Sequence, residues 1–107
     1  MIHISQVLTI VDRQLKHMKP KEAVQFKTYK QDRGFLIYCV DNSVFQLIET
    51  GCNNQSSIGD ARETRRLVKK SLKREFPRSN KVWVEYFHSV DNPSNISHLN
   101  SHQIPLF

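Results

Sequence analysis

Two stretches of the chain repeat hydrophobic residues at the spacing of an α-helix. Over residues 4 to 18 the apolar positions are Ile4, Val7, Leu8, Val11, Leu15 and Met18. Over residues 60 to 76 they are Ala61, Leu67, Val68, Leu72 and Phe76. Because residues three or four apart lie on one side of a helix, each stretch is predicted to be a helix with one buried face. Asp60 and Glu63 form a variant of the capping box at the start of the second helix, and Pro77 ends it.

The segments between and after these helices have the pattern of β-strands. Polar and apolar residues alternate over residues 22 to 31, and residues 35 to 40 are apolar on both sides. The turn between them ends in Gly34, a residue that can adopt positive φ. Asp41-Asn42 fits a tight hairpin into a third strand over residues 44 to 50, and residues 51 to 59 are predicted to be a polar loop. Residues 82 to 87 are rich in β-branched and aromatic types and predict a last strand.

The predicted order is therefore helix, three antiparallel strands, helix and strand. This order is typical of an α+β fold in which two helices pack on one face of a small antiparallel sheet. A chain of 107 residues can bury one core, so we expect a single domain over residues 1 to 90. From Asp91 on, the chain is poor in charge and rich in small polar residues, so residues 91 to 107 are expected to form a flexible tail.

The positive charge of the chain is concentrated in the second predicted helix. The whole chain has 16 basic and 10 acidic residues, and the segment over residues 60 to 78 alone has eight basic and three acidic residues. Seven basic residues share the half of the helix opposite its apolar positions: Arg62, Arg65, Arg66, Lys69, Lys70, Lys73 and Arg74. A solvated helix face usually mixes both signs, because like charges at i, i+4 spacing repel each other. The single-signed face therefore predicts a polyanionic partner, and these seven are the predicted nucleic-acid-binding residues.

The first predicted helix has a polar face of mixed charge. This face holds Gln6, Asp12, Arg13 and Lys16, and Lys16, His17 and Lys19 gather near its end. Charges of both signs on one face are typical of a solvated surface, so no binding role is predicted for it.

The first five predicted elements, over about residues 4 to 76, resemble the double-stranded-RNA-binding domain. That family has the same α-β-β-β-α order and a basic second helix. Its second helix opens with a Gly-rich turn and a Lys-Lys pair. Here residues 57 to 60 (Ser-Ile-Gly-Asp) lead into Arg62, and Lys69-Lys70 lies well inside the helix. The resemblance is one of topology, and none of the family's contact residues is transferred to this chain.

The cysteines and the C-terminal histidines show no pattern of a metal site. Cys39 and Cys52 are predicted to be reduced thiols, because strand pairing would place Cys52 far down the ladder from Cys39. His98 and His102 are four residues apart, but the Pro-, Ser- and Asn-rich surroundings do not favour the helix that would bring them together. We therefore expect no metal site and no cofactor.

His88 is the one histidine next to a predicted strand end with carboxylates nearby in the sequence. It could act as a general base beside Glu85 or Asp91. No nucleophile or oxyanion-binding loop can be paired with it, so no catalytic residue is predicted. A small nuclease or toxin remains a third class of function, without an acid/base cluster in its favour.

The chain ends in an apolar cluster that follows the polar tail. Its five residues, Gln103 to Phe107, resemble the motif by which bacterial polymerases and repair proteins bind the β sliding clamp. The resemblance implies that Gln103 makes polar contacts, that Ile104 takes the aliphatic position, and that Leu106 and Phe107 fill an apolar pocket. The alternative is that Leu106 and Phe107 fold back onto the sheet of the same chain.

Two classes of function follow from these features. The first is a non-catalytic, DNA-associated accessory protein, whose helix over residues 60 to 76 binds the phosphates of DNA or RNA while the tail tethers it to the sliding clamp. The alternative is a small protein-binding regulator or inhibitor, of the kind encoded by mobile elements, whose basic helix docks on an acidic protein surface. No apolar run reaches the length of a membrane span and the N-terminus lacks a signal-peptide pattern, so we expect a cytoplasmic protein with no membrane partner.

Overall fold

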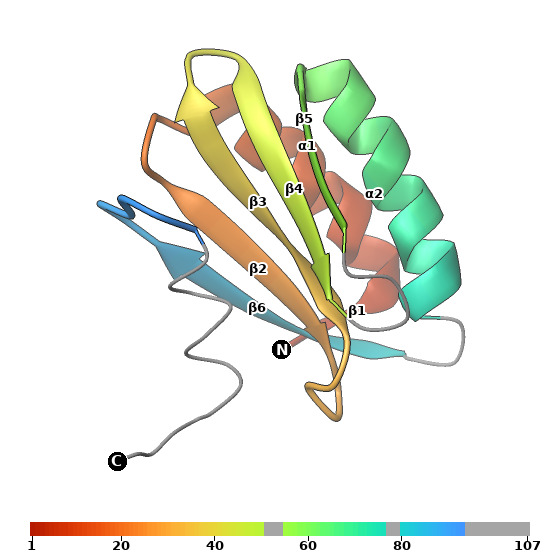
Figure 1. Cartoon of the computed structure of the whole chain (residues 1–107). Coiled ribbons are helices and arrows are strands. Elements are labelled where there is room, and N and C mark those ends of the chain that lie inside the picture. The colour runs from red at the N-terminus through yellow and green to blue at the C-terminus, as the bar shows by residue number, and fades with distance from the viewer. Residues whose placement is uncertain (51–54, 77–79, 94–107) are drawn as a thin grey trace.

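The structure confirms the α+β class and the predicted order of the main elements. It is a computed structural model and describes residues 1–50, 55–76 and 80–93. The helices are α1 (Val7–His17) and α2 (Ala61–Glu75), and a short 3-10 helix, η1 (Ile4–Gln6), precedes α1. The strands are β1 (Ile2–His3), β2 (Ala23–Thr28), β3 (Gly34–Asp41), β4 (Val44–Thr50), β5 (Gln55–Gly59) and β6 (Lys81–Phe87). They form one antiparallel sheet in the order β1-β6-β2-β3-β4-β5 (Figure 1).

The hydrophobic core lies between the sheet and the two helices. Both helices cover the same face of the sheet, so the fold has two layers (Figure 1). Side chains alternate between the two faces of each strand, and every second residue of β2 and β3 therefore enters the core. The buried members come from four strands, both helices and the residue after α2: Val7, Val11, Val24, Phe26, Phe35, Ile37, Cys39, Phe45, Leu47, Val68, Phe76 and Val82.

The two helices lie side by side in an antiparallel arrangement. Asp12, in the middle of α1, pairs with Arg65 of α2, and His17 at the end of α1 lies beside Ala61 at the start of α2. The second half of α1 is therefore next to the first half of α2. The regular helix α1 is shorter than the predicted helix over residues 4 to 18, because its first residues form η1, for which the His3 side chain is the cap.

Residues 55 to 59, predicted to be part of a loop, form the edge strand β5. This strand pairs with β4, for example Ile58 with Gln46. Its sequence, Gln-Ser-Ser-Ile-Gly, has no apolar alternation, because an edge strand can be held by the backbone hydrogen bonds of its neighbour without burying its side chains. The predicted loop is wrong at these positions, and residues 51–54 lie outside the described part of the chain.

The chain crosses from one edge region of the sheet to the other through α2. After β5 it passes along α2, which packs on β3, β4 and β5, and then enters the sheet as β6 between β1 and β2. Glu85 of β6 pairs with Gln25 of β2, and Val82 pairs with Ile2 of β1. The basic helix is therefore anchored to the sheet at both of its ends.

Gly34 does not supply the positive φ that the sequence suggested for the β2–β3 turn. Gln31 has that conformation, with φ 61°, whereas Gly34 is the first residue of β3 and pairs with Lys27. A Cβ atom at position 34 would collide with the carbonyl oxygen of Phe26. Glycine is thus needed here because the neighbouring strand lies too close for a side chain.

The β3–β4 corner also differs by one residue from the prediction. Asp41 pairs with Val44, so Asn42 and Ser43 form the corner, and Ser43 takes the positive φ of 59°. The register of β3 shifts between Cys39 and Asp41, so that Cys39 lies opposite Phe45 of β4.

The chain after β6 turns back against the face of the sheet that the helices leave uncovered. The hydroxyl of Tyr38 donates a hydrogen bond to the carbonyl oxygen of Val90, and the Val90 N–H donates to the carbonyl oxygen of Lys21 at 2.8 Å. Asp91 then pairs with the amine of Lys21 at 3.2 Å. Residues 94–107 of the predicted tail lie outside the described part of the chain.

Candidate nucleic-acid interface

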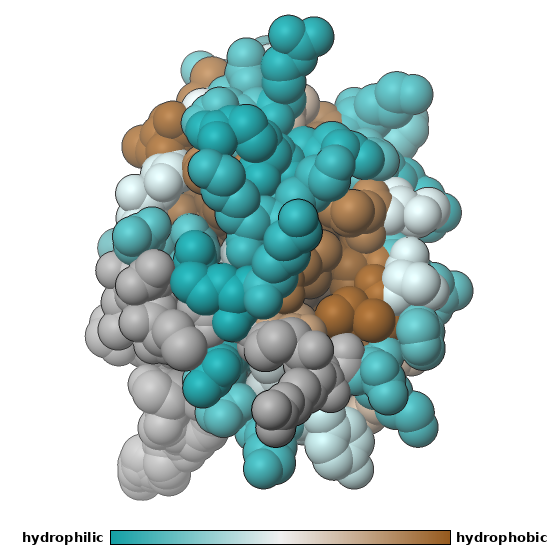
Figure 2. Space-filling view, turned by 90° about the vertical axis from the view of Figure 1, so that its right-hand side faces the viewer, coloured by the Kyte–Doolittle hydropathy of each residue, from teal (hydrophilic) through white to brown (hydrophobic). Residues whose placement is uncertain are grey.

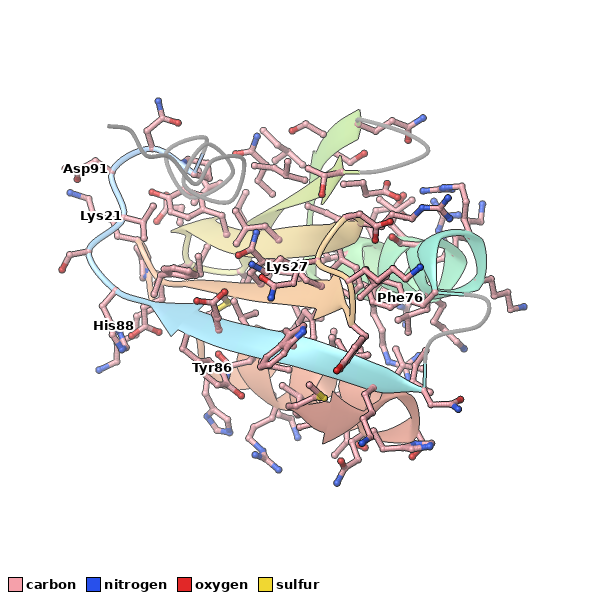
Figure 3. All side chains as sticks on the ribbon, turned by 90° about the horizontal axis from the view of Figure 1, so that it is seen from below. Lys21, Lys27, Phe76, Tyr86, His88 and Asp91 are labelled. Carbon is pink, nitrogen blue, oxygen red and sulfur yellow. The ribbon has the colours of Figure 1, made fainter. Side chains whose placement is uncertain are left out.

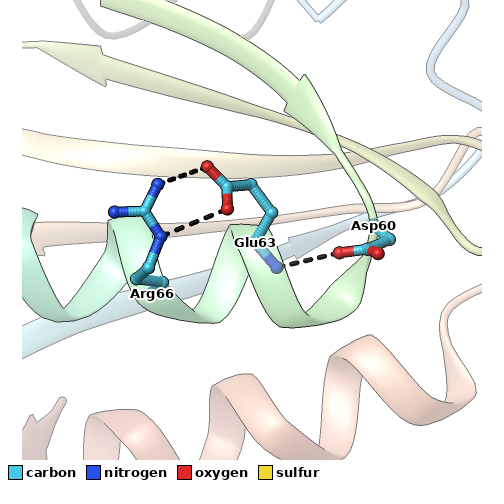
Figure 4. Close-up of polar contacts among 3 residues, drawn as sticks. All are labelled: Asp60, Glu63 and Arg66. Atoms are coloured by element: carbon cyan, nitrogen blue, oxygen red, sulfur yellow. Dashed lines mark hydrogen bonds and ion pairs between the residues drawn. The ribbon is translucent and has the colours of Figure 1, made fainter.

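Two carboxylates organise the start of α2. Asp60 caps the helix by accepting a hydrogen bond from the N–H of Glu63 at 2.9 Å, which is the half of the capping box that the sequence predicted. The Glu63 carboxylate turns to Arg66 instead of back to Asp60, and accepts hydrogen bonds from two of its guanidinium nitrogens (Figure 4). Hydrogen bonding to Arg66 lowers the pKa of Glu63, so this pair is charged at neutral pH.

Three of the seven predicted binding residues are arginines that form ion pairs. Arg66 pairs with Glu63 within α2, whereas Arg65 reaches across to α1 and donates from Nε to Asp12 Oδ1 at 2.6 Å. Arg74 pairs with Glu49 of β4, and the Glu49 side chain is only 4% exposed. The face of α2 is therefore not single-signed, contrary to what the sequence suggested: Glu63 lies on it, and carboxylates of α1 and β4 pair with two more of its arginines. Arg74 holds the end of the helix to the sheet.

The other four predicted binding residues are exposed cations. They are Arg62, Lys69, Lys70 and Lys73. Within the described part of the chain, none of them forms an ion pair with a carboxylate. Figure 2 looks at the α2 side of the molecule and shows hydrophilic side chains gathered there, with apolar groups exposed beside them. Because no carboxylate of the described residues forms an ion pair with them, these four cations are the most available to the phosphates of a partner.

An open groove between the two helices adds cations from α1. The groove has a volume of about 670 Å³ and is formed by the second half of α1 and the first turns of α2. Its charged and ionisable lining consists of Asp12, Arg13, Lys16, His17, Arg62 and Arg65. Sequence reasoning set Arg13 and Lys16 aside as parts of a solvated face, and only the packing of the helices brings them beside α2. The cluster of Lys16 and His17 at the end of the first helix was the available signal.

The two helices together account for the net charge of the whole chain. α2 has seven basic and two acidic residues and α1 has two and one, which gives +6 with neutral histidines, the same value as for the complete sequence. The remaining segments are neutral in sum. Since both helices lie on one face of the sheet, the excess positive charge lies on one side of the molecule (Figure 1).

His88 contacts neither of the carboxylates that the sequence placed near it. Its Nδ1 lies 3.4 Å from a carboxylate oxygen of Glu22, at the end of the sheet where Figure 3 shows His88 and Asp91. Glu85 pairs with Lys27 at 3.3 Å instead. His88 therefore does not form the acid/base pair with Glu85 or Asp91 that the sequence allowed, since Glu85 pairs with Lys27 and Asp91 pairs with Lys21.

Cys39 is a free thiol buried in the core. Burial, and to a smaller extent the charges of Glu22 and Asp41, raise the pKa of the Cys39 thiol. Such a thiol is a poor nucleophile at neutral pH.

Among the described residues, no group of three or more His, Cys, Asp or Glu side chains could hold a metal ion. Eight residues singled out in the sequence lie outside the described part: Cys52, Pro77, His98, His102, Gln103, Ile104, Leu106 and Phe107.

Comparisons with other proteins add nothing to these observations. Searches against protein families, curated proteins and solved structures found no match to this chain. In the described part of the chain, neither helix is long and apolar enough to cross a membrane.

Proposed function

We propose that this protein is a non-catalytic nucleic-acid-binding accessory protein. In this proposal the helical layer, which consists of α1 and α2, contacts phosphates. The observation that carries this proposal is that α1 and α2, which share one face, hold the whole net charge of +6. A one-sided positive surface attracts a polyanion and orients the protein on it. DNA is the favoured partner because the proposed tail contact, the sliding clamp, operates on DNA.

The exposed cations are the proposed first contacts with the phosphate backbone. Arg62, Lys69 and Lys73 span about 17 Å along α2, given a rise of about 1.5 Å per residue. This span allows contacts with several successive phosphates of a duplex, which carries about one charge per 1.7 Å of its axis. Phosphate contacts position a protein without reading bases, so we propose binding that is largely independent of sequence.

Salt dependence of duplex binding tests the proposal directly. Each phosphate neutralised contributes a slope of about −0.9 in log K against log salt, so four exposed cations give a slope of about −3.6. The measurement is fluorescence anisotropy of a labelled DNA duplex between low and physiological salt. Absence of binding to DNA and RNA duplexes at the lowest salt would remove the proposal.

Neutralising the carboxylates that pair with the arginines of α2 is expected to strengthen DNA binding. Asp12→Asn frees Arg65 and Glu63→Gln frees Arg66 from its charged partner, so each substitution is expected to strengthen duplex binding several-fold at low salt. Each should also steepen the salt slope by about one unit. The cap at Asp60 is unaffected because it uses the backbone N–H of Glu63.

A matched control separates this local effect from the overall change in charge. Asp91→Asn raises the net charge by the same amount and also breaks an ion pair, with Lys21, but it lies after β6, where the chain packs against the sheet face that the helices leave uncovered. We expect this variant to bind DNA like the parent protein. Equal gains for Asp91→Asn and Asp12→Asn would mean that the helical layer is not the binding surface.

The proposed tether to the bacterial sliding clamp rests on the C-terminal pentapeptide alone. Deletion of residues 103 to 107 is expected to abolish clamp binding and to leave the melting temperature unchanged, because the polar segment before them offers little to hold the end of the chain. Binding of the intact protein to purified clamp would be measured at about tens of micromolar, the range of weak peptide contacts.

Full-length variants check that result without shortening the chain. Gln103→Ala, and Leu106→Ala combined with Phe107→Ala, should each weaken clamp binding. A drop of many degrees in melting temperature on deletion would instead mean that these apolar residues belong to the core. No binding by the intact protein would show that the motif match is accidental.

A second candidate function is supported by the lining of the interhelical groove. Leu15 and Ala61 lie among its cations, so the groove also fits an acidic, amphipathic segment of a protein partner. This is the chemistry expected of a regulator that docks its basic helix on an acidic protein surface. A protein-only binder should show no duplex affinity at low salt and should retain its partner in a pull-down after nuclease treatment.

A further inference from the structure

Tyr29 and Trp83 form a stacked aromatic pair at one end of the sheet. Their ring centroids are 6.5 Å apart with an interplanar angle of 21°. The indole N–H of Trp83 donates a hydrogen bond to the carbonyl oxygen of Tyr29 at 2.9 Å, which fixes the indole against the backbone of its neighbour. Tyr29 is 62% exposed. A ring that is stacked on one side and this exposed leaves its other side open to solvent.

The β2–β6 pairing and the turn after β2 fix the positions of the two rings. Trp83 stands opposite Lys27 in the β2–β6 pairing, and Tyr29 directly follows β2. The turn after Tyr29 is held by a hydrogen bond from the Thr28 hydroxyl to Asp32 Oδ1 at 2.8 Å and by one from the Thr28 N–H to the carbonyl oxygen of Arg33 at 2.9 Å. The aromatic pair is therefore preorganised, which reduces the entropy lost when a ligand stacks on it.

The exposed ring of Tyr29 is not explained by a packing role in the hydrophobic core. The aromatic contacts of the core join buried rings, with Phe26 stacked on Phe35 at 5.0 Å and Phe35 packed edge-on against Phe76 at 6.0 Å. Tyr29 contacts none of these rings within the described aromatic pairs, and most of its surface stays in water. It contributes little to the burial of apolar surface that stabilises the domain.

The pair lies on the face of the sheet opposite the helices, at the end of the sheet next to the C-terminal end of α2. The turn that carries Tyr29 lies at the sheet end where Phe35 contacts Phe76, the residue that follows α2, and Figure 3 shows Lys27 and Phe76 away from the end that holds His88. Lys30 and Arg33 lie in the same turn and add positive charge. A nucleic-acid strand bound along α2 would reach the aromatic pair by passing around this end of the sheet.

We infer that the stacked pair of Tyr29 and Trp83 is a platform for an unpaired nucleobase, with Lys30 and Arg33 placed for the adjoining phosphates. Stacking of bases on exposed aromatic rings beside cations is the usual mode of single-strand binding, and it tolerates any base because every base has a π-face. The inference rests on the proposed function and specifies it further. The preferred partner is nucleic acid with single-stranded segments or ends.

The chain carries its own probe for this contact, because Trp83 is its single tryptophan. Trp83 fluorescence would be followed during titration with oligothymidylate, with a closed hairpin duplex, and with heparin, a polyanion without bases. We expect oligothymidylate alone to quench the fluorescence, although all three ligands bind. Tyr29→Ala should weaken oligothymidylate binding about 5- to 100-fold, the cost of losing one stacked base, and leave heparin binding unchanged.

Two control variants make the test specific to the aromatic ring. Tyr29→Phe keeps a ring that can stack and should bind like the parent protein. Tyr86→Ala removes a similarly exposed tyrosine, 52% exposed, from the His88 end of β6, and should have no effect on binding (Figure 3).

The outcomes separate the platform from the proposed function. Equal quenching by heparin, or unchanged oligothymidylate affinity of Tyr29→Ala, would overturn the platform and leave polyanion binding by the helices standing. Quenching by oligothymidylate without any binding of heparin or duplex would support the platform and remove the proposed role of the helical layer.

Discussion

Replacing Arg62, Lys69, Lys70 and Lys73 together by glutamine is expected to lower the affinity for duplex DNA about 10²- to 10³-fold at physiological salt. These are the exposed cations of α2 without an ion pair to a carboxylate in the described part of the chain. The loss of four phosphate contacts should also reduce the salt slope by about 3.6 units. Both quantities come from titrations of a labelled duplex at several salt concentrations.

The stability of this variant should be close to that of the parent protein. Its four side chains are exposed and glutamine is a good helix former, so the melting temperature should change by only a few degrees. A charge-matched comparison uses two double variants: Lys69→Gln with Lys73→Gln, and Lys19→Gln with Lys21→Gln. Only the pair in α2 should weaken binding strongly. Equal losses for both pairs would show that net charge, and not the helix, decides the affinity.

Arg74→Met is expected to cost about 3–5 kcal/mol of the free energy of unfolding. Arg74 pairs with Glu49, whose side chain is 4% exposed, and removal of the guanidinium leaves an uncompensated buried carboxylate. In a domain of this size the melting temperature should fall by more than about 10 °C. Thermal and urea unfolding followed by circular dichroism would measure both values.

A second substitution tests the cause of that loss. Glu49→Leu combined with Arg74→Met replaces both charges with apolar groups and should recover much of the stability. Arg66→Met removes an arginine from an exposed pair with Glu63, and should cost less than about 1 kcal/mol. If Arg74→Met were no more destabilising than Arg66→Met, Arg74 would belong with the binding residues and not with the supports of the fold.

The elements with a strong local pattern were predicted from the sequence, and those without one were not. α2 was predicted within one residue at each end, since its apolar positions recur at helical spacing and Asp60 and Pro77 mark its limits. β5 was missed because its side chains are mostly polar and exposed. β1 was missed because it has only two residues. Both strands exist through pairing with a neighbour, which no local pattern reports.

The candidate interface, too, could be predicted from the sequence only in part. The basic face of α2 could be predicted because the position of a residue around a helix follows from its number in the sequence. The partners of its arginines could not, since Arg65 lies 53 residues from Asp12 and Arg74 lies 25 residues from Glu49. The pair of Tyr29 and Trp83, 54 residues apart, was likewise invisible until β6 was placed beside β2.

The sequence by itself determined the two amphipathic helices, the main strands, the α+β class and the concentration of charge in residues 60 to 76. These features depend on periodicity and composition within short windows, where helix and strand geometry fix the face of each side chain. Only the tertiary structure decided which exposed cations of α2 have no paired carboxylate among the described residues, and that α1 contributes Arg13 and Lys16 to the groove beside α2. Contacts between distant residues depend on how the helices and strands pack, and packing is set by the whole core at once.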